Sequence, residues 1–176
     1  MQILGALQQA DLRLFAWLFR NGERFFLISP ARAVSHSGDG YLHVLIPLLL
    51  IFMGAERAGD LVLVLAFALS LERPLYWVLK NALRRRRPEQ FVPGFRSLIV
   101  ASDRFSFPSG HSSAAFLLVT CLCVIYGAAA LPMLAWAAAV GLSRIVLGVH
   151  FPGDISAGAS MGTVTALFAS SLLGLY

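Results

Sequence analysis

The chain has 176 residues, of which 58% are hydrophobic and 13% charged, with a net charge of +5 and a mean hydropathy of +0.75. A soluble domain of this length carries about twice that charge fraction. Residues 112–143 and 155–176 contain no Asp, Glu, Lys or Arg, whereas a soluble helical core would need polar residues at helical spacing. Because about 20 apolar residues span a bilayer, the composition excludes a soluble fold and predicts an all-α, polytopic membrane helix bundle.

The N-terminal region leaves two interpretations open. Residues 1–20 alternate between apolar and polar positions, which predicts a helix lying at the membrane interface or the start of a span. Residues 24–36 are apolar but contain Pro30 and Arg32, so the pattern does not decide whether they complete a first span. The next four residues, Ser37-Gly38-Asp39-Gly40, predict a turn.

Two spans are predicted next, over residues 41–55 and from residue 61 to about 83. The second carries Glu72 and Arg73 in its middle, followed by Pro74. Ionisable side chains are costly at that depth, so we expect them to face the bundle interior as a pair. Such a pair is either functional or a structural ion pair beside a kink, and the second interpretation is preferred.

Residues 84–108 form a long polar connection, and connections of this length are more often functional than idle. It begins with four consecutive arginines, Arg84 to Arg87. Nucleic-acid binding is one interpretation of such a run, but beside membrane spans it more often indicates lipid headgroups, a topology signal or a phosphate site. We therefore expect a membrane lipid and the bilayer as partners, and no nucleic acid.

Three further spans are predicted, over residues 112–125, 133–147 and 154–175. With the N-terminal region they make about six transmembrane helices in a single membrane-embedded domain of residues 1–176. The alternating direction of the spans places several polar residues at one membrane face, where an active site is expected: Lys80, Arg87, His111, Arg144, His150 and Asp154.

Pro108-Ser109-Gly110-His111 stands between the polar connection and an apolar helix. Pro108 and Gly110 predict a turn, and Ser109 is predicted to be the N-cap of the helix that follows. Backbone N–H groups and the positive end of the helix dipole then converge beside His111, which favours an anion. Cations would complete this site: Arg side chains fit phosphate oxygens bidentately and Lys acts as a point charge. The expected phosphate-binding residues are Lys80, Arg87, Ser109, Gly110 and Arg144.

Two histidines and one aspartate indicate the chemistry. Asp154 follows His150 by four residues, so its carboxylate can hold one imidazole nitrogen and make the other more basic. That nitrogen could attack phosphorus to give a phosphohistidine, while His111 protonates the leaving oxygen and later activates water. A two-metal phosphatase needs clustered carboxylates, which this face lacks, so neither a metal nor another cofactor is expected.

The three motifs resemble those of the type 2 phosphatidic acid phosphatases, a family that includes bacterial phosphatidylglycerophosphate and undecaprenyl diphosphate phosphatases and shares a site with vanadium haloperoxidases. The family pattern is Lys, six residues, Arg-Pro; then Pro-Ser-Gly-His; then Ser-Arg, five residues, His, three residues, Asp. Here it reads as Lys80 to Arg87-Pro88, Pro108 to His111, and Ser143-Arg144 to His150 to Asp154. Every position matches, within residues 80–154.

The resemblance implies a six-helix membrane fold and metal-independent hydrolysis through a phosphohistidine. It implies His150 as nucleophile, Asp154 as its orienting carboxylate and His111 as general acid and base. It also implies phosphate binding by the five residues Lys80, Arg87, Ser109, Gly110 and Arg144.

We therefore expect a lipid phosphatase acting on a phosphate monoester or diphosphate such as undecaprenyl diphosphate, phosphatidylglycerophosphate, phosphatidate or a lipid A phosphate. One alternative is a lipid phosphotransferase that uses the same intermediate. The other is a non-catalytic lipid-phosphate binding or transport protein, and the intact His150–Asp154 pair argues against this second alternative only. Specificity is expected in the 89–106 loop and a lateral apolar groove. The arginine run favours a cytoplasmic site by the positive-inside rule, but the resemblance implies a multi-pass protein of the cell (inner) membrane with an extracytoplasmic active site.

Overall fold

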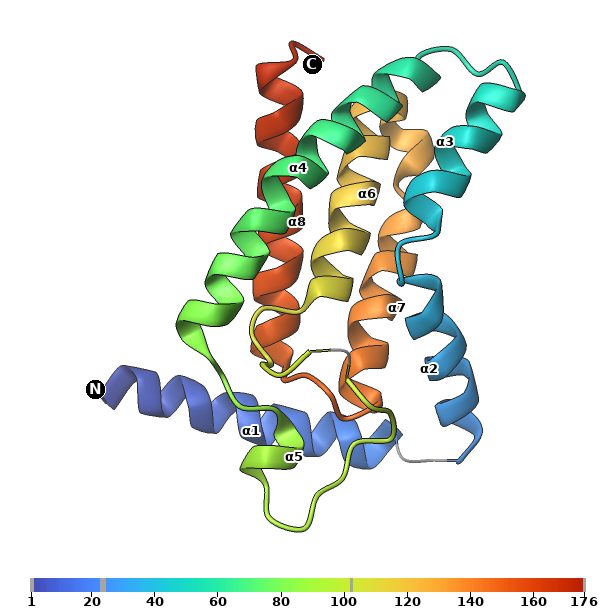
Figure 1. Ribbon diagram of the computed structural model, residues 1–176. Helices are drawn as coiled ribbons and strands as arrows, with labels where there is room; N and C mark the ends of the chain where they lie inside the picture. Colours follow the sequence, from blue (N-terminus) through green and yellow to red (C-terminus); the bar gives the residue numbers. More distant parts are fainter. Residues whose placement is uncertain (1, 23–24, 102, 176) are drawn as a thin grey trace.

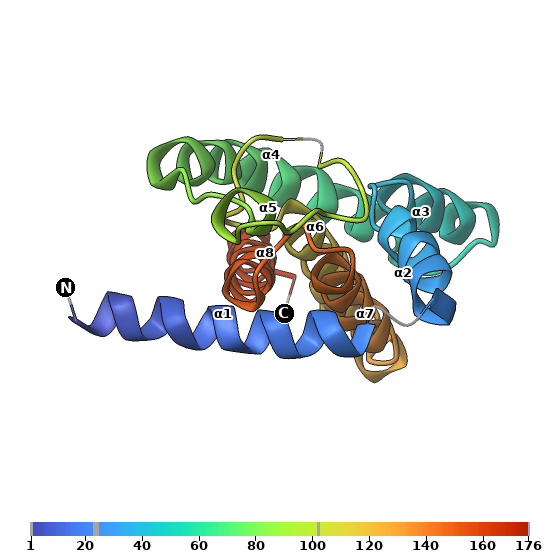
Figure 2. The same cartoon turned by 90° about the horizontal axis from the view of Figure 1, so that it is seen from below.

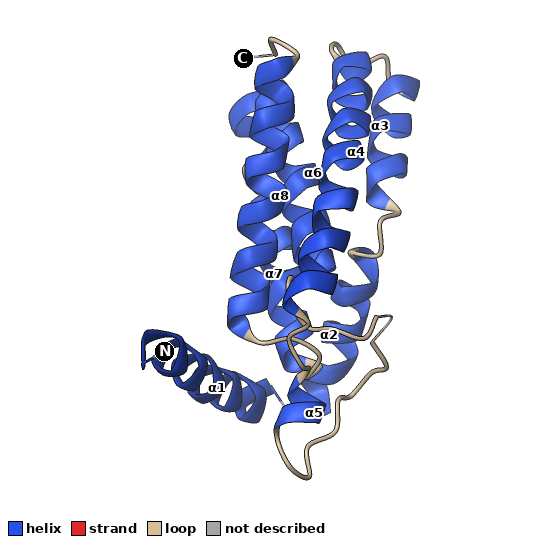
Figure 3. Ribbon diagram, turned by 60° about the vertical axis from the view of Figure 1, so that its left-hand side comes forward, coloured by secondary structure: helices blue, strands red, loops and turns tan. Residues whose placement is uncertain are grey.

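The structure is a computed structural model that describes residues 2–22, 25–101 and 103–175, and in these ranges it contains helices and no strands (Figures 1 and 3). The predicted all-α class is confirmed. In chain order the elements are α1 (Gln2–Gly22), α2 (Phe25–Ser37), α3 (Leu42–Phe52), α4 (Ala58–Leu83), α5 (Pro88–Phe91), α6 (Gly110–Tyr126), the 3-10 helix η1 (Gly127–Ala130), α7 (Met133–Val146) and α8 (Pro152–Leu172).

The bundle is apolar on its outer surface as well as inside. Among the described residues, three helical segments are long and apolar enough to cross a membrane, 58–91, 110–130 and 152–172, and α3 and α7 are shorter apolar helices. On α3, Leu45, Leu48 and Leu49 are each more than half exposed. Apolar side chains on the outside of helices whose backbone hydrogen bonds are internal suit a lipid surrounding, so the chain is a multi-pass membrane protein.

Helix α1 lies across one end of the bundle (Figures 1 and 2). This arrangement agrees with the interfacial interpretation of residues 1–20. Phe15 packs against Phe151, with ring centroids 5.3 Å apart, and Phe19 packs against Phe95 at 4.8 Å. Through these rings α1 supports the turn that precedes α8, which carries the most C-terminal of the three motifs.

Helices α2 and α3 follow one another along the side of the bundle and are separated by the turn that the sequence predicts (Figures 1 and 3). At this turn the chain approaches α7 closely, because a Cβ on Gly38 would lie 2.7 Å from Val140 Cγ1. The break between α2 and α3 therefore lies against the bundle, and it carries Asp39 to the start of α6.

Helices α6 and α8 form the most intimate pair in the core. Gly158 and Gly162 of α8 face α6, where added Cβ atoms would overlap the carbonyl oxygens of Ser109 and Ser113. Small residues four apart allow membrane helices to approach closely when no hydrophobic effect drives them together. The close approach fixes the motif at the start of α6 against the motif at the start of α8, and the amide of Ser109 donates to the carbonyl of Asp154 at 3.0 Å.

Candidate active site

A pocket of about 530 Å³ lies where the three motifs meet. Of the sequence-predicted site residues, Arg87, Gly110, His111, Arg144 and His150 line it. Lys80, Ser109 and Asp154 are buried and do not line it. The remaining lining residues are Gly38, Asp39, Gly40, His43, Val44, Leu69, Arg73, Tyr76, Asp103 and Ala114.

His150 is held in the turn between α7 and α8 and is 2% exposed. Its Nδ1 lies 3.5 Å from Asp154 Oδ2 and has no hydrogen-bond partner among the described residues. Burial lowers the pKa of His150 to about 4, against the opposing effect of Asp154 and with a smaller contribution from the Arg87 charge. The imidazole is therefore neutral at neutral pH, the state in which a ring nitrogen can act as a nucleophile.

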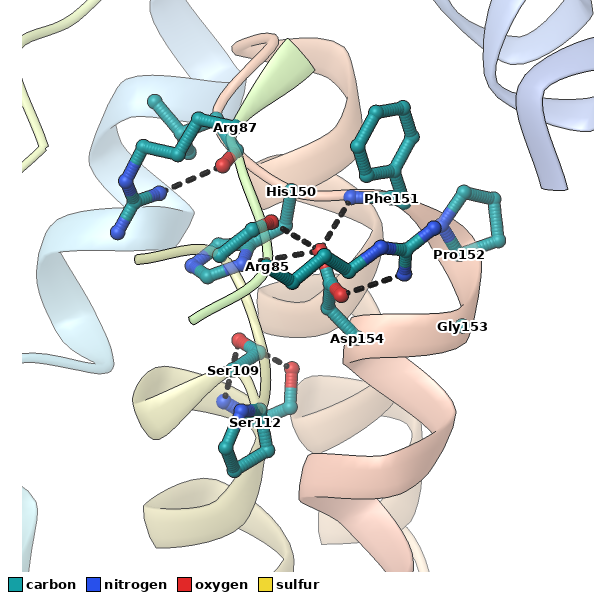
Figure 4. Close-up of polar contacts among 12 residues, drawn as sticks. Arg85, Arg87, Ser109, Ser112, His150, Phe151, Pro152, Gly153 and Asp154 are labelled. Carbon is teal, nitrogen blue, oxygen red and sulfur yellow. Dashed lines mark hydrogen bonds and ion pairs between the residues drawn. The ribbon is translucent and has the colours of Figure 1, made fainter. Parts of the chain in front are cut away.

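Asp154 accepts hydrogen bonds at both carboxylate oxygens (Figure 4). Arg85 Nη1 donates to Oδ1 at 2.7 Å, and the amide of Phe151 donates to Oδ2 at 2.8 Å. The Ser106 hydroxyl also donates to Oδ2. Arg85 in turn contacts Asp11 of α1 at 2.5 Å. The carboxylate beside His150 is thus fixed by three donors from two segments, the 84–108 connection and the turn before α8, and Arg85 is a donor that the family pattern does not specify.

A carboxylate occupies the centre of the cation cluster. Lys80 Nζ lies 2.7 Å from Asp103 Oδ2, Tyr76 donates its hydroxyl to the same oxygen at 2.6 Å, and Arg87 Nη2 pairs with Oδ1. Burial raises the pKa of Asp103, but the Lys80 and Tyr76 hydrogen bonds and the Arg87 charge outweigh it and hold the pKa at about 2. Asp103 therefore presents two anionic oxygens to cations that the sequence assigns to phosphate.

The two motif arginines are positioned by hydrogen bonds to protein oxygens. Arg87 donates through Nη1 to the carbonyl of Val149 at 2.6 Å. Arg144 Nη1 donates to the Ser35 hydroxyl at 2.5 Å, and its buried Nε has no hydrogen-bond partner among the described residues. An unsatisfied buried donor is costly unless a ligand completes it. This arrangement suits an incoming anion.

His111, at the start of α6, is held from the opposite side by the turn between α2 and α3. Its Nε2 lies 2.7 Å from Asp39 Oδ1, and the other oxygen of Asp39 lies 2.5 Å from Nδ1 of His36. Burial by itself would raise the pKa of Asp39. The hydrogen bonds to His111 and His36 outweigh that effect, so the pKa lies below the ordinary 3.8. Asp39 is therefore an ionised partner for His111.

The predicted N-cap at Ser109 is confirmed. Its hydroxyl oxygen accepts from the amide of Ser112 at 3.4 Å and from the Ser112 hydroxyl at 3.1 Å. Ser109 is fully buried, so its side chain completes the helix start, while Gly110 reaches the pocket. A Cβ on Gly110 would lie 3.1 Å from the Tyr76 ring.

The predicted pairing of Glu72 with Arg73 is confirmed, but only Glu72 faces the interior. Glu72 is fully buried, pairs with Arg73 Nε and accepts from the Ser113 hydroxyl at 2.5 Å. The Arg73 side chain is 48% exposed and lines the pocket.

Sequence reasoning missed several polar residues around the pocket. None of them is a specified position of the family pattern, and only the charges of Asp39, Arg85 and Asp103 and the length of the 84–108 connection pointed toward them. They are Asp39, Tyr76, Arg85, Asp103 and Ser106.

The comparisons with known proteins agree with this architecture. The family model of the PAP2 superfamily matches residues 57–174, more than half of the chain. The chain therefore belongs to the PAP2 superfamily. Several of its similar proteins are named as phosphatases, among them a decaprenylphosphoryl-5-phosphoribose phosphatase, a lipid A 1-phosphatase and a phosphatidylglycerophosphatase, and the chain is a membrane-bound phosphoric ester hydrolase of this family.

Individual relatives cover most of the chain. It is 28% identical over 150 residues to decaprenylphosphoryl-5-phosphoribose phosphatase of Mycobacterium tuberculosis, which covers 84% of this chain and 81% of that protein. It is 33% identical over 135 residues to phosphatidylglycerophosphatase B of Bacillus subtilis, with coverage of 67% and 62%. The crystal structure of Aquifex aeolicus LpxE has a TM-score of 0.78 at 26% identity, with coverage of 91% and 94%.

Proposed function

We propose that this protein hydrolyses the phosphate of a membrane lipid through a phosphohistidine formed on His150. The observation that carries the proposal is that His111 and His150 line the same pocket as Arg87 and Arg144. With Nδ1 of His150 turned to Asp154, Nε2 is the nitrogen available for attack. The lipid phosphates and diphosphates considered above share a phosphoryl group that this pocket fits.

In the first step, Nε2 of His150 attacks phosphorus in line with the lipid oxygen. The N–P bond forms as the P–O bond to the lipid breaks, and His111 donates its proton to the leaving oxygen. Asp154 stabilises the positive imidazole. The cations stabilise the charge on the three remaining phosphoryl oxygens, where catalysis of phosphoryl transfer mostly lies.

In the second step, neutral His111 takes a proton from water, which attacks the phosphohistidine. The N–P bond breaks, inorganic phosphate leaves, and His150 returns to its neutral state. Asp39 favours protonated His111 in the first step because an ionised carboxylate lies 2.7 Å from its ring nitrogen.

The proposed intermediate is tested with lipid substrate carrying labelled phosphate. Purified protein in detergent is mixed with substrate and quenched within one turnover. We expect a label on the protein that is stable to base and labile to acid, absent from His150→Ala. His150→Ala that still binds substrate but releases no phosphate separates catalysis from binding. Phosphate release by His150→Ala at the wild-type rate would overturn the proposal.

We also propose that the pocket opens on the extracytoplasmic side of the cell inner membrane. Arg85 and Arg87 are bound to carboxylates and carbonyls inside the protein, so they are poor indicators of topology. Val100 of the nearby loop is 96% exposed. A Val100→Cys variant in intact cells should react with a membrane-impermeant maleimide, while the parent with its own Cys121 and Cys123 serves as control. Labelling only after cell lysis would place the site on the cytoplasmic side.

A further inference from the structure

Arg73 is a pocket cation that none of the three motifs contains. Its Nε is held by Glu72, which is fully buried and anchored by the Ser113 hydroxyl. No hydrogen bond of its two terminal nitrogens to another described residue is present, although the side chain is 48% exposed and lines the pocket. An arginine in a membrane-spanning helix is costly and marks a functional site by default. The buried glutamate therefore holds the guanidinium by one edge and leaves its other edge toward the pocket.

Tyr76 connects this arginine to the phosphate-binding cations. Arg73 Cζ lies 4.9 Å from the centre of the Tyr76 ring and Lys80 Nζ lies 4.6 Å from it, so the two cationic groups are less than about 10 Å apart. The Tyr76 hydroxyl donates to Asp103 Oδ2, and Lys80 contacts the same oxygen. A phosphate that displaced this carboxylate would thus lie within one side chain's length of Arg73.

The position of Arg73 along α4 places it on the bilayer side of the reacting group. It precedes Lys80 by seven residues, about two helical turns or 10 Å along the helix axis. Leu69, which lies one turn further from Lys80 on α4, and Val44 of α3 also line the pocket and are apolar. A lipid whose terminal phosphate reaches Lys80 and Arg87 would therefore pass Arg73 before its tail enters the membrane.

We propose that Arg73 binds a second anionic group of the substrate, a phosphodiester that lies between the reacting phosphate and the lipid tail. This inference rests on the proposed function and names its substrate class. Guanidinium pairs bidentately with phosphodiester oxygens. Two phosphates joined by a three-carbon alcohol are six bonds of about 1.5 Å apart, a span that fits the separation of Arg73 from Lys80. Phosphatidate carries one phosphate and would leave Arg73 facing its acyl chains.

The test compares three lipids in mixed micelles with the full-length protein: phosphatidylglycerophosphate, phosphatidate and an isoprenyl diphosphate. The readout is the ratio of kcat/KM for phosphatidylglycerophosphate to that for each of the other two. We expect a ratio above about ten in the wild type, a loss of most of it in Arg73→Gln, and partial retention in Arg73→Lys, because one hydrogen bond to a charged group changes affinity by about tenfold or more. Arg86→Gln, an exposed arginine at the same end, is the matched control and should keep the ratio.

Removing Arg73 alone leaves Glu72 buried and unpaired, so a double variant, Glu72→Gln with Arg73→Gln, separates binding from folding. If Arg73 binds substrate, the double variant has the low ratio of Arg73→Gln. Recovery of the wild-type ratio in the double variant overturns the proposal, because Arg73 would then serve only to neutralise Glu72. A wild-type ratio near one, or an effect of Arg73→Gln confined to the isoprenyl diphosphate, also overturns it. Absence of phosphate release from all three lipids by the wild type would instead count against the proposed function.

Discussion

Arg85 and Asp154 form an ion pair in which Arg85 Nη1 lies 2.7 Å from Asp154 Oδ1. Asp154 is the carboxylate beside His150, and Arg85 also reaches Asp11 of the transverse helix α1. A group that fixes an orienting residue of a catalytic site affects the rate through geometry. The N-terminal helix, which carries no family motif, is therefore connected to the proposed nucleophile through one arginine.

We predict that Arg85→Gln lowers kcat by about tenfold and changes KM by less than a factor of about two, because substrate does not touch this residue. Arg85→Lys should restore part of the rate, since it can still pair with Asp154. The neighbouring Arg86 is exposed, and Arg86→Gln is the control. Steady-state kinetics in detergent check the prediction. An unchanged kcat in Arg85→Gln would show that Ser106 and the Phe151 amide hold Asp154 without it.

Asp39 gives a prediction about the leaving group. Its carboxylate pairs with His111, the proposed acid. Asp39→Asn should slow hydrolysis of a lipid alkyl phosphate by about tenfold, which is less than the roughly 100- to 10,000-fold that general acid–base catalysis contributes, because His111 itself remains. It should affect p-nitrophenyl phosphate much less, because that leaving group needs no proton. Equal losses with both substrates would mean that Asp39 does not act through proton donation.

The position of Asp103 predicts that its carboxylate competes with phosphate for Lys80 and Arg87. With a pKa of about 2, Asp103 remains anionic through the working pH range and occupies Lys80 and Arg87. Asp103→Asn should strengthen inhibition by orthovanadate or inorganic phosphate by about tenfold, since charged hydrogen bonds are the strong ones. Its Tm in phosphate-free buffer should fall, with a larger rise on adding phosphate than in the wild type. Glu89→Gln, an exposed carboxylate of the same connection, is the control. Weaker inhibition in Asp103→Asn would contradict this prediction.

Burial of His150 predicts a pH dependence of stability. The folded protein holds this residue neutral down to a pKa of about 4, against an ordinary value of 6.5. As the pH falls, the unfolded chain takes up the proton first. The contribution of neutral His150 to the free energy of unfolding is therefore fully present above pH 6.5 and is lost as the pH falls from 6.5 toward 4. We expect the Tm in detergent to fall by several degrees across this window. His150→Asn should show a shallower dependence, and an equally steep one would assign the effect to other groups.

The packing of α8 on α6 predicts an asymmetry between two glycines. A Cβ on Gly162 would overlap the Ser113 carbonyl, whereas a Cβ on Gly59 of α4 meets nothing within 4 Å. Gly162→Ala should therefore destabilise the protein by about 1–3 kcal/mol, the usual cost of overpacking. Gly59→Ala should leave the Tm unchanged or raise it slightly, because alanine is the better helix former. Thermal unfolding followed in detergent compares the two, and a Tm loss in both would point to a general effect of glycine replacement.

The amino-acid sequence by itself determined the all-α membrane class, the approximate helix bounds from residue 41 onward, and the N-cap at Ser109. These features follow from local properties: the length of apolar runs, the positions of Pro and Gly, and the hydrogen bonding of one hydroxyl at a helix start. The four-residue spacing of His150 and Asp154 likewise predicted that the carboxylate lies beside the imidazole. The roles of these motif residues in catalysis stay predictions.

Only the tertiary structure decided which partners the motif residues have. Asp39 meets His111 across 72 positions of the chain, and Arg85 meets Asp11 across 74. No periodicity or spacing encodes such pairs, because they depend on how α1 and the turn before α3 pack on the bundle. The same packing also decided that Arg73 lines the pocket while Glu72 is buried in the interior. The sequence shows only that the two residues are adjacent in a membrane-spanning helix, and adjacency does not reveal which of them faces the pocket.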